Sequence, residues 1–295
     1  MHQLRYFLAV ADEGNFTRAA EKCFISQPSL SSQIIKLEEE LGQKLFNRLG
    51  RTAELTGAGR VLERRARSIL LDVENVQLEI QQGATEAQGL IHVGATPSVA
   101  PYLMPQVIAN CKKLYPKLEI SMHENLRVRL LDDLIAGELD LAIIAITGEH
   151  PDISAEPLLE EELYLVVSDS HPLASKTKVS IEDFKDEPLI TLGESSTLGR
   201  KIMEFFGRNE YEPKVAGTCS QVRTLKEMVD RGLGVAILPK MAIDLSEPFK
   251  VVYRSLESNR MNRLLFILTH DKRYHPPGVR AFTDVLREYV DENLD

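Results

Sequence analysis

The sequence predicts an α/β module of two lobes, preceded by an all-α domain and a long linker helix. From Leu90 to the carboxyl end, short apolar runs alternate with helical patterns, as in a mainly parallel sheet that helices cover on both sides. A heptad pattern without proline fills residues 57–82, and two short amphipathic helices joined by a turn precede it. With 295 residues the chain has the length of two or three compact units.

The two short helices have the features of a helix-turn-helix. The first contains the small residues Ala19 and Ala20, which allow the second helix to cross closely. Pro28 fits the first turn of the second helix, so that Gln27 and Ser29 lie at the end that meets base edges in such motifs. The expected inward stripe is Phe16, Phe24, Ile25, Leu30, Ile34 and Leu37. The alternative is an ordinary helical pair with a solvated polar face.

The amino-acid sequence of this segment resembles that of a known family. Ala-Ala-Glu-Lys, Ser-Gln-Pro-Ser-Leu-Ser and Leu-Glu-x-x-Leu-Gly follow one another between residues 19 and 42, before Leu45-Phe46-x-Arg48 and Leu55-Thr56-x-x-Gly59. The stretch is similar to the amino-terminal domain of LysR-type transcriptional regulators over about the first 85 residues. The resemblance implies a DNA-binding transcriptional regulator that a small molecule controls, with no enzymatic activity and no cofactor.

The resemblance and the polar face together predict the residues that contact double-stranded operator DNA. Major-groove contacts are expected from Gln27, Pro28, Ser29, Ser32, Gln33 and Lys36. Thr17, Arg48 and Arg51 are expected to position the DNA backbone. The two arginines lie in residues 44–56, which read as a hairpin wing; solvated loop charges are the alternative. Many relatives have Arg in place of Ser32, so a different base preference is expected here.

The amino-terminal part of the chain, the head, differs in net charge from the remainder, the body. Residues 1–67 contain eleven Lys and Arg against eight Asp and Glu, about +3, within a chain of net charge -9, which leaves about -12 for the rest. An acidic body repels DNA, so DNA binding is assigned to the head alone. No segment approaches the roughly 18 apolar residues of a membrane span, and the amino terminus lacks the features of a secretion signal. We therefore expect a cytoplasmic protein with no membrane partner.

The sequence contains no pattern typical of metal binding or catalysis. Cys23, Cys111 and Cys219 are widely spaced, and no Cys-x-x-Cys or clustered His accompanies them. A Gly-x-Gly-x-x-Gly, a Walker loop and a Gly-x-Ser-x-Gly are all missing from the sequence. Of the competing class built on the α/β body, an enzyme therefore has no positive signal, and a solute-binding protein would need a secretion signal that the sequence does not show.

The long helix predicts self-association. Its apolar residues recur at steps of four and three, which gives the seam Leu62, Ala66, Ile69, Val73, Val76 and Ile80. Such a seam favours a homodimer, or a homotetramer built from it; packing of the helix on its own domain is the alternative. RNA polymerase is a further partner that the resemblance implies.

The expected domains follow from these elements. The winged helix-turn-helix covers residues 1–58, and the linker helix and hinge cover residues 59–89. Lobe I is expected from residues 90–162 together with 265–295, and lobe II from residues 163–264. Two such lobes, with the chain passing between them more than once, resemble a periplasmic-binding-protein module with a ligand cleft between the lobes.

Ligands of open parallel sheets bind beyond the carboxyl ends of strands, at the turns into the following helices. Two of these turns contain hydroxyls, Thr96 and Ser98 in the first lobe and Ser196 and Thr197 in the second. Free N–H groups and the positive end of the helix dipole suit an anion such as a carboxylate. Plain N-capping is the alternative. Ser98 and Thr197 also fall where LysR-type proteins usually contact effectors.

Two more residues complete the expected effector site. Arg127 follows the second strand and can neutralise an anion, while Gln221 begins a helix whose family position often faces the cleft. Residues 96–105 look most similar to the peroxide-sensing branch, which uses a reactive Cys and a second Cys in the following lobe. This chain has Thr197 and Phe206 there, so sensing by that thiol route is not expected.

Overall fold

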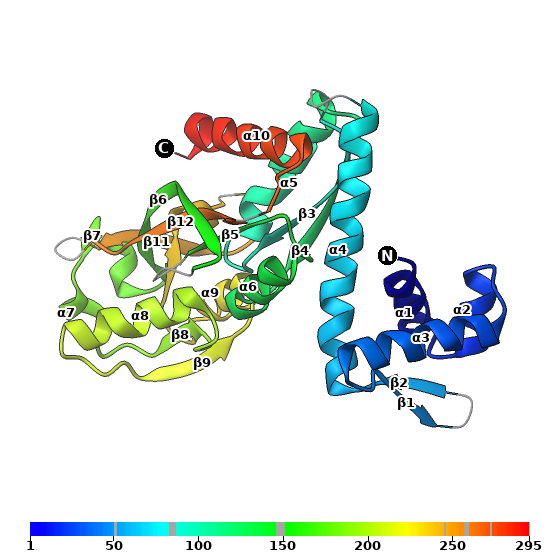
Figure 1. Ribbon diagram of the computed structural model, residues 1–295. Helices are drawn as coiled ribbons and strands as arrows, with labels where there is room; N and C mark the ends of the chain where they lie inside the picture. The colour runs from blue at the N-terminus through cyan, green and yellow to red at the C-terminus, as the bar shows by residue number, and fades with distance from the viewer. Residues whose placement is uncertain are drawn as a thin grey trace. The chain divides into compact units, whose positions relative to one another are not determined.

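The computed structural model describes residues 1–49, 52–82, 87–145, 151–244, 246–256, 260–271 and 273–294. Figure 1 shows the order of the helices and strands along the chain. The chain divides into two compact units, the first Met1–Glu86 and the second beginning at Ala87. Each unit has its own apolar core, so each is built around a separate hydrophobic cluster.

Three helices form the body of the first unit: α1 (His2–Glu13), α2 (Phe16–Lys22) and α3 (Gln27–Leu41). The side chain of Asn15 begins α2 by accepting hydrogen bonds from the backbone N–H groups of Thr17 and Arg18, at 2.8 and 3.1 Å. Ser26 begins α3 in the same way, and Gly42 ends it in the left-handed conformation. The predicted helix-turn-helix is confirmed.

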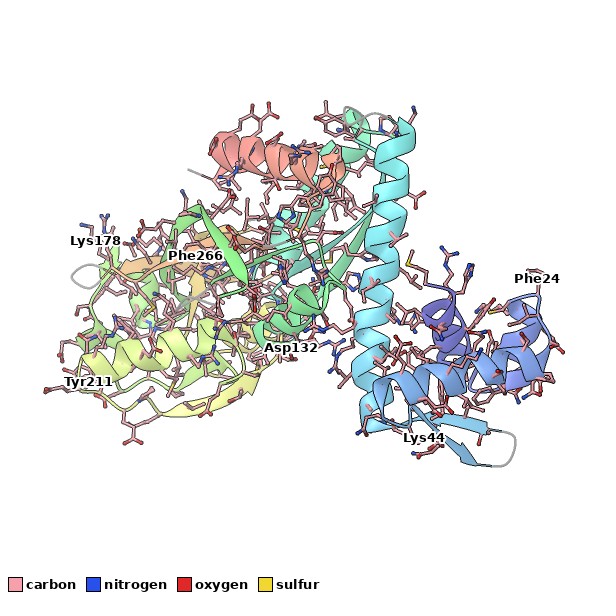
Figure 2. The ribbon with its side chains drawn as sticks, viewed as in Figure 1. Phe24, Lys44, Asp132, Lys178, Tyr211 and Phe266 are labelled. Carbon is pink, nitrogen blue, oxygen red and sulfur yellow. The ribbon has the colours of Figure 1, made fainter. Side chains whose placement is uncertain are left out.

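The core of this unit confirms most of the predicted inward stripe and corrects one member. Ala19, Ala20, Leu30 and Ile34 are fully buried. Phe24 is instead 95% exposed, and Figure 2 shows it at the turn between α2 and α3. Its backbone has a left-handed φ of +55°, which makes the turn and directs the side chain away from the core. The expectation that it packs inward is therefore wrong.

The wing is a hairpin of β1 (Phe46–Leu49) and antiparallel β2 (Thr52–Leu55). Glu38 of α3 holds its base: one carboxylate oxygen accepts from the Leu45 N–H at 2.8 Å, and the other accepts from Lys44 Nζ at 2.8 Å. Burial by itself raises the pKa of Glu38, but the hydrogen bonds from Lys44 and the backbone outweigh it and lower that pKa below its ordinary value. An ionised Glu38 thus joins α3, which corresponds to the recognition helix of a helix-turn-helix, to the wing.

The long helix α4 (Gly57–Gln82) begins against the same wing base. Thr56 donates a hydrogen bond to the Lys44 carbonyl at 2.6 Å and accepts one from the Gly59 N–H at 3.0 Å. A Cβ at position 59 would lie 2.2 Å from the Leu45 carbonyl oxygen, so only glycine permits this approach.

The heptad seam of α4 divides into two parts. Leu62 is half-buried and Ala66 fully buried against the core of the first unit, so these two residues pack on their own domain rather than on a partner. Farther along, Ile69 and Val76 are 44% and 46% exposed. The side chain of Ile80 lies outside the described part of the helix. An apolar surface therefore remains on α4 beyond its contact with the head.

The second unit starts with the parallel strands of lobe I. β3 (Gly89–Ala95) lies between β4 (Leu118–Glu124) and β5 (Leu141–Ala145) and runs parallel to both. Apolar side chains of one sheet face pack with α5 (Ala100–Leu114) and α10 (Pro277–Asn293), and those of the other face pack with α6 (Arg127–Ala136). The βαβ alternation predicted for this lobe is confirmed.

Two long strands connect the lobes. β6 (Ile153–Ser168) and β12 (Asn262–His270) are antiparallel neighbours, and β12 is also antiparallel to β5. The second half of β6 pairs with β10 (Ala236–Pro239) and β11 (Val251–Leu256). The expectation of a mainly parallel sheet is therefore wrong at its centre. The reason is topological: the chain leaves lobe I along β6 and returns along β12, so the two strands run in opposite directions.

Lobe II has a core of its own around short parallel strands and their helices. β8 (Leu189–Leu192) and β9 (Val215–Cys219) are parallel, and β7 (Lys178–Val179) pairs in parallel with β11. Its remaining elements are η1 (Pro172–Ser175), α7 (Ile181–Phe184), α8 (Thr197–Arg208), α9 (Val222–Asp230) and η2 (Lys240–Ala242). Both α8 and α9 follow directly on strands, so their amino-terminal ends lie at carboxyl ends of the sheet.

Candidate functional site

The recognition helix presents a polar surface at its first turns. Gln27, Pro28 and Ser29 are exposed there, and the Gln27 amide donates to the Ser31 hydroxyl at 2.9 Å. The other predicted contacts on the described part of the head are Thr17, Ser32 and Lys36, which are exposed, and Gln33, which is half-buried. The fold thus places these side chains on the outer surface of α2 and α3, available to a groove of DNA.

The remaining predicted DNA contacts lie in the wing. Only the backbone of Arg48 is described, and Arg51 lies outside the described residues, so their DNA contacts stay predictions. Arg18 is exposed beside Thr17 and donates to the Glu13 carbonyl at 2.5 Å, so its guanidinium interacts within the first unit.

Turns from both lobes meet at a small cavity. Lobe I contributes the predicted residues Thr96, Ser98 and Arg127, and lobe II contributes Ser196 and Thr197. The rest of the lining is Pro97, Leu126, Ala145, Leu192, Ser195, Leu198 and Ser220. The cavity volume is about 20 Å³, room for one water molecule or a group of similar size.

Helix starts surround this cavity. Arg127 is the first residue of α6 and Thr197 the first of α8, while Ser98 lies two residues before α5 and Ser220 two before α9. Each start has backbone N–H groups without a partner in its own helix and the positive end of the helix dipole. The convergence of four such ends produces a positive potential suited to an anion.

The two predicted hydroxyls of the second lobe differ in whether they have a hydrogen-bond partner. Ser196 caps α8, because its oxygen accepts from the Gly199 N–H at 3.4 Å. The Thr197 hydroxyl is buried without a hydrogen-bond partner, and so is Nε of Arg127. An unpartnered buried polar group costs free energy. A bound acceptor in the cavity would remove this cost for both groups, which plain capping does not.

One predicted residue lies elsewhere. Gln221 is exposed at the start of α9 and is not among the described residues that line the cavity, whereas its neighbour Ser220 is. Ser195 also lines the cavity and was missed by the sequence reasoning. Ser195 adjoins the predicted Ser196 and Ser220 adjoins the predicted Gln221, so extending each predicted segment by one residue would have included both serines.

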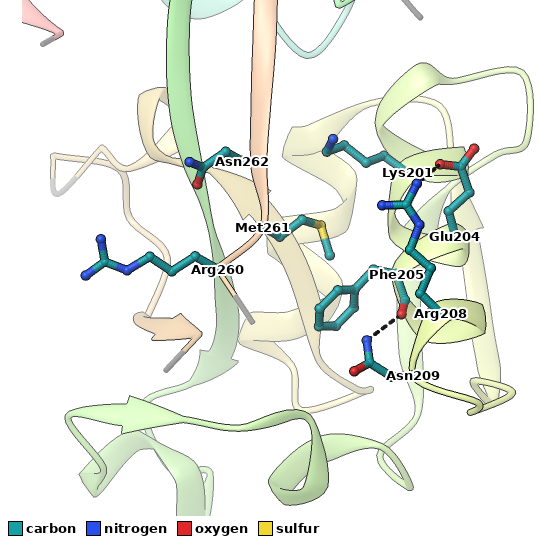
Figure 3. Close-up of a pocket in the computed structure, with 8 residues that line it drawn as sticks. All are labelled: Lys201, Glu204, Phe205, Arg208, Asn209, Arg260, Met261 and Asn262. Atoms are coloured by element: carbon teal, nitrogen blue, oxygen red, sulfur yellow. Dashed lines mark hydrogen bonds and ion pairs between the residues drawn. The ribbon is translucent and has the colours of Figure 1, made fainter. Parts of the chain in front are cut away.

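A larger cavity of about 480 Å³ lies between α8 and the beginning of β12. Figure 3 shows Phe205 and Met261 facing each other across it, with the guanidinium group of Arg260 directed away from α8. Arg208 pairs with Glu204 at 3.9 Å on its open side. None of its described lining residues has a buried polar side-chain atom without a partner. Its cationic side chains are not directed at a common point, which makes it the weaker candidate for an anion site.

The three cysteine thiols are poorly suited to act as reactive thiolates. Burial raises the pKa of each, to about 11 for Cys111, and in Cys23 it outweighs the lowering effect of Lys22. Cys219 is buried, with its sulfur 3.6 Å from that of Met228. A thiol with a raised pKa is a weak nucleophile towards oxidants. The position that faces the cavity is occupied by the hydroxyl of Thr197 instead.

Two further kinds of site were sought in the described part of the chain. No group of three or more His, Cys, Asp or Glu side chains there has the spacing of a metal site. No helix in the same residues has the length and apolar character needed to span a bilayer.

Comparison with known families matches both units. The model of the bacterial regulatory helix-turn-helix protein, lysR family, matches residues 1–60. The model of the LysR substrate binding domain matches residues 84–291. Together these matches cover most of the chain, including α2, α3 and the cavity.

Individual proteins give the same result. The hydrogen peroxide-inducible genes activator of Dickeya chrysanthemi is 35% identical over 243 residues, covering 82% of this chain and 80% of the relative. The HTH-type transcriptional regulator AlsR of Bacillus subtilis is 29% identical over 97% of this chain and 94% of its own length. Among solved structures, a full-length OxyR variant from Pseudomonas aeruginosa has a TM-score of 0.78 at 30% identity and covers 97% of this chain and 93% of its own. Full-length BenM has a TM-score of 0.63 at 26% identity, with coverage of 100% and 98%.

Proposed function

Because this chain belongs to the LysR family of DNA-binding transcriptional regulators, we propose that it is controlled by a small anion bound between the two lobes of its second unit. The anion is held at the cavity by Arg127 and by the hydroxyls of Ser98 and Thr197. The cavity volume of about 20 Å³ admits one small anionic group. A larger ligand requires the lobes to separate.

One observation carries this proposal. Nε of Arg127 and the hydroxyl of Thr197, from different lobes, are both buried in the cavity lining without partners. Arg127 is half-buried, but its Nε is fully buried, and a buried N–H of a cationic group favours an acceptor, best a negatively charged one. Four helix starts add their positive potential at the same place. An anion bridging these two groups satisfies both at once.

Such binding couples the ligand to the arrangement of the lobes. The anion interacts with Arg127 of lobe I and Thr197 of lobe II only when the two turns are close together. It therefore stabilises the closed arrangement by the difference between its affinities for the closed and open forms. In a homodimer paired through α4, this difference alters how the two DNA-binding heads meet an operator.

The ligand test compares two molecules of the same shape. Formate should raise the melting temperature of the second unit, whereas formamide, its neutral analogue, should not. Replacement of Arg127→Met should abolish the formate shift. Arg208→Met, which removes an exposed arginine from the other cavity, should leave the shift unchanged. A panel of chloride, nitrate, formate and acetate that produces no shift would refute anion binding.

The DNA test concerns the recognition helix. An operator is first selected from random duplexes with the protein itself. Gln27→Ala should then weaken binding to that operator while the helix content is unchanged, because the side chain is exposed and its loss leaves the core intact. An unaltered affinity in a salt-matched gel-shift titration would remove Gln27 from the DNA contacts.

The dimer test uses the exposed surface of α4. Val76→Lys places a charge on the part of the helix that is free of the head, so it should lower the mass measured by light scattering. Val61→Lys is the matched control, since Val61 is also exposed but lies outside the predicted seam. Equal masses for wild type and Val76→Lys would place the dimer contact elsewhere.

A further inference from the structure

A buried ion pair lies where the chain crosses between the lobes. Arg263 on β12 is directly opposite Glu161 on β6, and its Nε donates to a Glu161 carboxylate oxygen at 2.6 Å. Both side chains are only 2% exposed. A buried pair of this kind seldom adds net stability over apolar residues, because both charges are desolvated. A stabilising role alone is therefore a poor account of its presence.

The remaining atoms of the pair lead to the ligand cavity. Nη1 of Arg263 donates to the Ser98 hydroxyl oxygen at 2.9 Å, and Nη2 donates to the Ser98 carbonyl at 3.0 Å. The second carboxylate oxygen of Glu161 accepts from the Met241 N–H at 2.9 Å. The planar fork of one arginine thus grips both the side chain and the backbone of a single serine that lines the cavity.

This grip fixes what Ser98 can offer a ligand. Its oxygen already accepts a hydrogen bond from Arg263, which occupies one of its two lone pairs and favours the hydroxyl hydrogen for donation to a ligand. The Arg263 charge is matched by Glu161 at 2.6 Å, which leaves Arg127 as the cation of the cavity lining. The pair sets the direction of a donor without adding a second charge to the anion.

We infer that Arg263, held by Glu161, is the positioning residue of the anion site: it orients Ser98 as a hydrogen-bond donor and thereby selects ligands that accept. The inference rests on the proposed function and adds to it the residue pair that determines ligand selectivity. It also connects the cavity to the two crossing strands, because the pair belongs to β6 and β12 while the serine belongs to the turn before α5.

The test is a double-mutant cycle on formate affinity, measured by calorimetry on the full-length protein. Arg263→Lys keeps the charge but loses the fork, and Ser98→Ala removes the hydroxyl. Each should weaken formate binding about tenfold, the effect of losing one hydrogen bond to a charged group. If Arg263 acts through Ser98, the double variant should be no weaker than Ser98→Ala alone.

The matched control is Arg254→Lys, since Arg254 is a half-buried arginine of β11, a neighbour of β6, but donates to Ala174 and Tyr253 rather than to a residue of the cavity. It should bind formate as the wild type does. If Arg263→Lys does not fold, Glu161→Gln takes its place in the same cycle, because it removes the charge that holds Arg263 and shortens no side chain.

Non-additive losses with an unchanged control support the inference. If the wild type binds formate but the losses of the two single variants add up in the double variant, the inference is overturned, because Arg263 then acts on the fold in general. The proposed function is left standing by that result. A wild type that binds no anion of the panel would refute the proposed function, and the positioning role would fall with it. The two failures are thus distinguishable.

Discussion

Replacement of Thr197 by valine should make the unliganded protein more stable and its anion binding weaker. The Thr197 hydroxyl is buried in the cavity lining without a partner. Burial of such a hydroxyl costs about 1–3 kcal/mol, and valine has nearly the same shape without the polar atom. We take the lower end of this range, about 1 kcal/mol, because Thr197 as a whole is only half-buried. In a unit of this size that corresponds to a rise in melting temperature of about 2–4 °C.

The assay is thermal unfolding of the full-length protein with and without formate. Thr197→Val should melt higher without ligand and show a smaller formate shift, with affinity about tenfold lower, the equivalent of about 1.4 kcal/mol. Thr283→Val is the matched control, because the Thr283 hydroxyl donates to the Val279 carbonyl at 2.9 Å and its loss should not raise the melting temperature. A fall in the melting temperature of Thr197→Val would show that this hydroxyl is satisfied in the folded protein and would refute the reasoning.

Three further substitutions test the head. Glu38→Gln should lower the free energy of unfolding by about 2 kcal/mol at neutral pH. Because folding lowers the pKa of Glu38, the wild type should lose this advantage as the pH falls from the unfolded pKa, about 4.3, through the folded one. Parallel urea titrations measure the free energy of unfolding of both proteins at each pH, and a difference that persists at low pH would contradict this reasoning. Gly59→Ala should destabilise by about 1–3 kcal/mol, since its Cβ would lie 2.2 Å from the Leu45 carbonyl oxygen; normal operator binding and melting would contradict the close approach. Phe24→Gly should raise stability by up to about 1 kcal/mol, because glycine adopts the φ of +55° without strain; a lower melting temperature would indicate a contact that the exposed ring makes.

The parts of the fold that depend on local signals could be predicted from the sequence. Asn15 and Gly42 mark where α2 begins and α3 ends, and the apolar period of α3 is local as well. Phe24 shows the limit of that reasoning. Its apolar side chain fits the predicted inward stripe, but the left-handed backbone φ of the turn determines the direction in which the side chain points.

Non-local features were out of reach of the sequence. The directions of β6 and β12 follow from the path of the chain between lobes, which no local pattern encodes. Arg263 and Glu161 are 102 residues apart, and a single arginine in an apolar strand gives no signal of its partner. In the candidate site, hydroxyl-rich turns indicated Thr96, Ser98, Ser196 and Thr197, which the fold brings together. Gln221 failed to join them because a helix start faces several directions, and spacing does not select one.

The small size of the cavity has a kinetic consequence. Its walls come from both lobes, with Leu126, Leu192 and Leu198 among them, and only about 20 Å³ is open inside. Under the proposed function, an anion larger than this space enters and leaves only when the lobes part, so its exchange is set by the frequency of opening rather than by diffusion. The observed association rate should therefore level off as ligand concentration rises. A regulator with the proposed site responds at a pace set by the opening of its lobes, and it retains the ligand for the lifetime of the closed form.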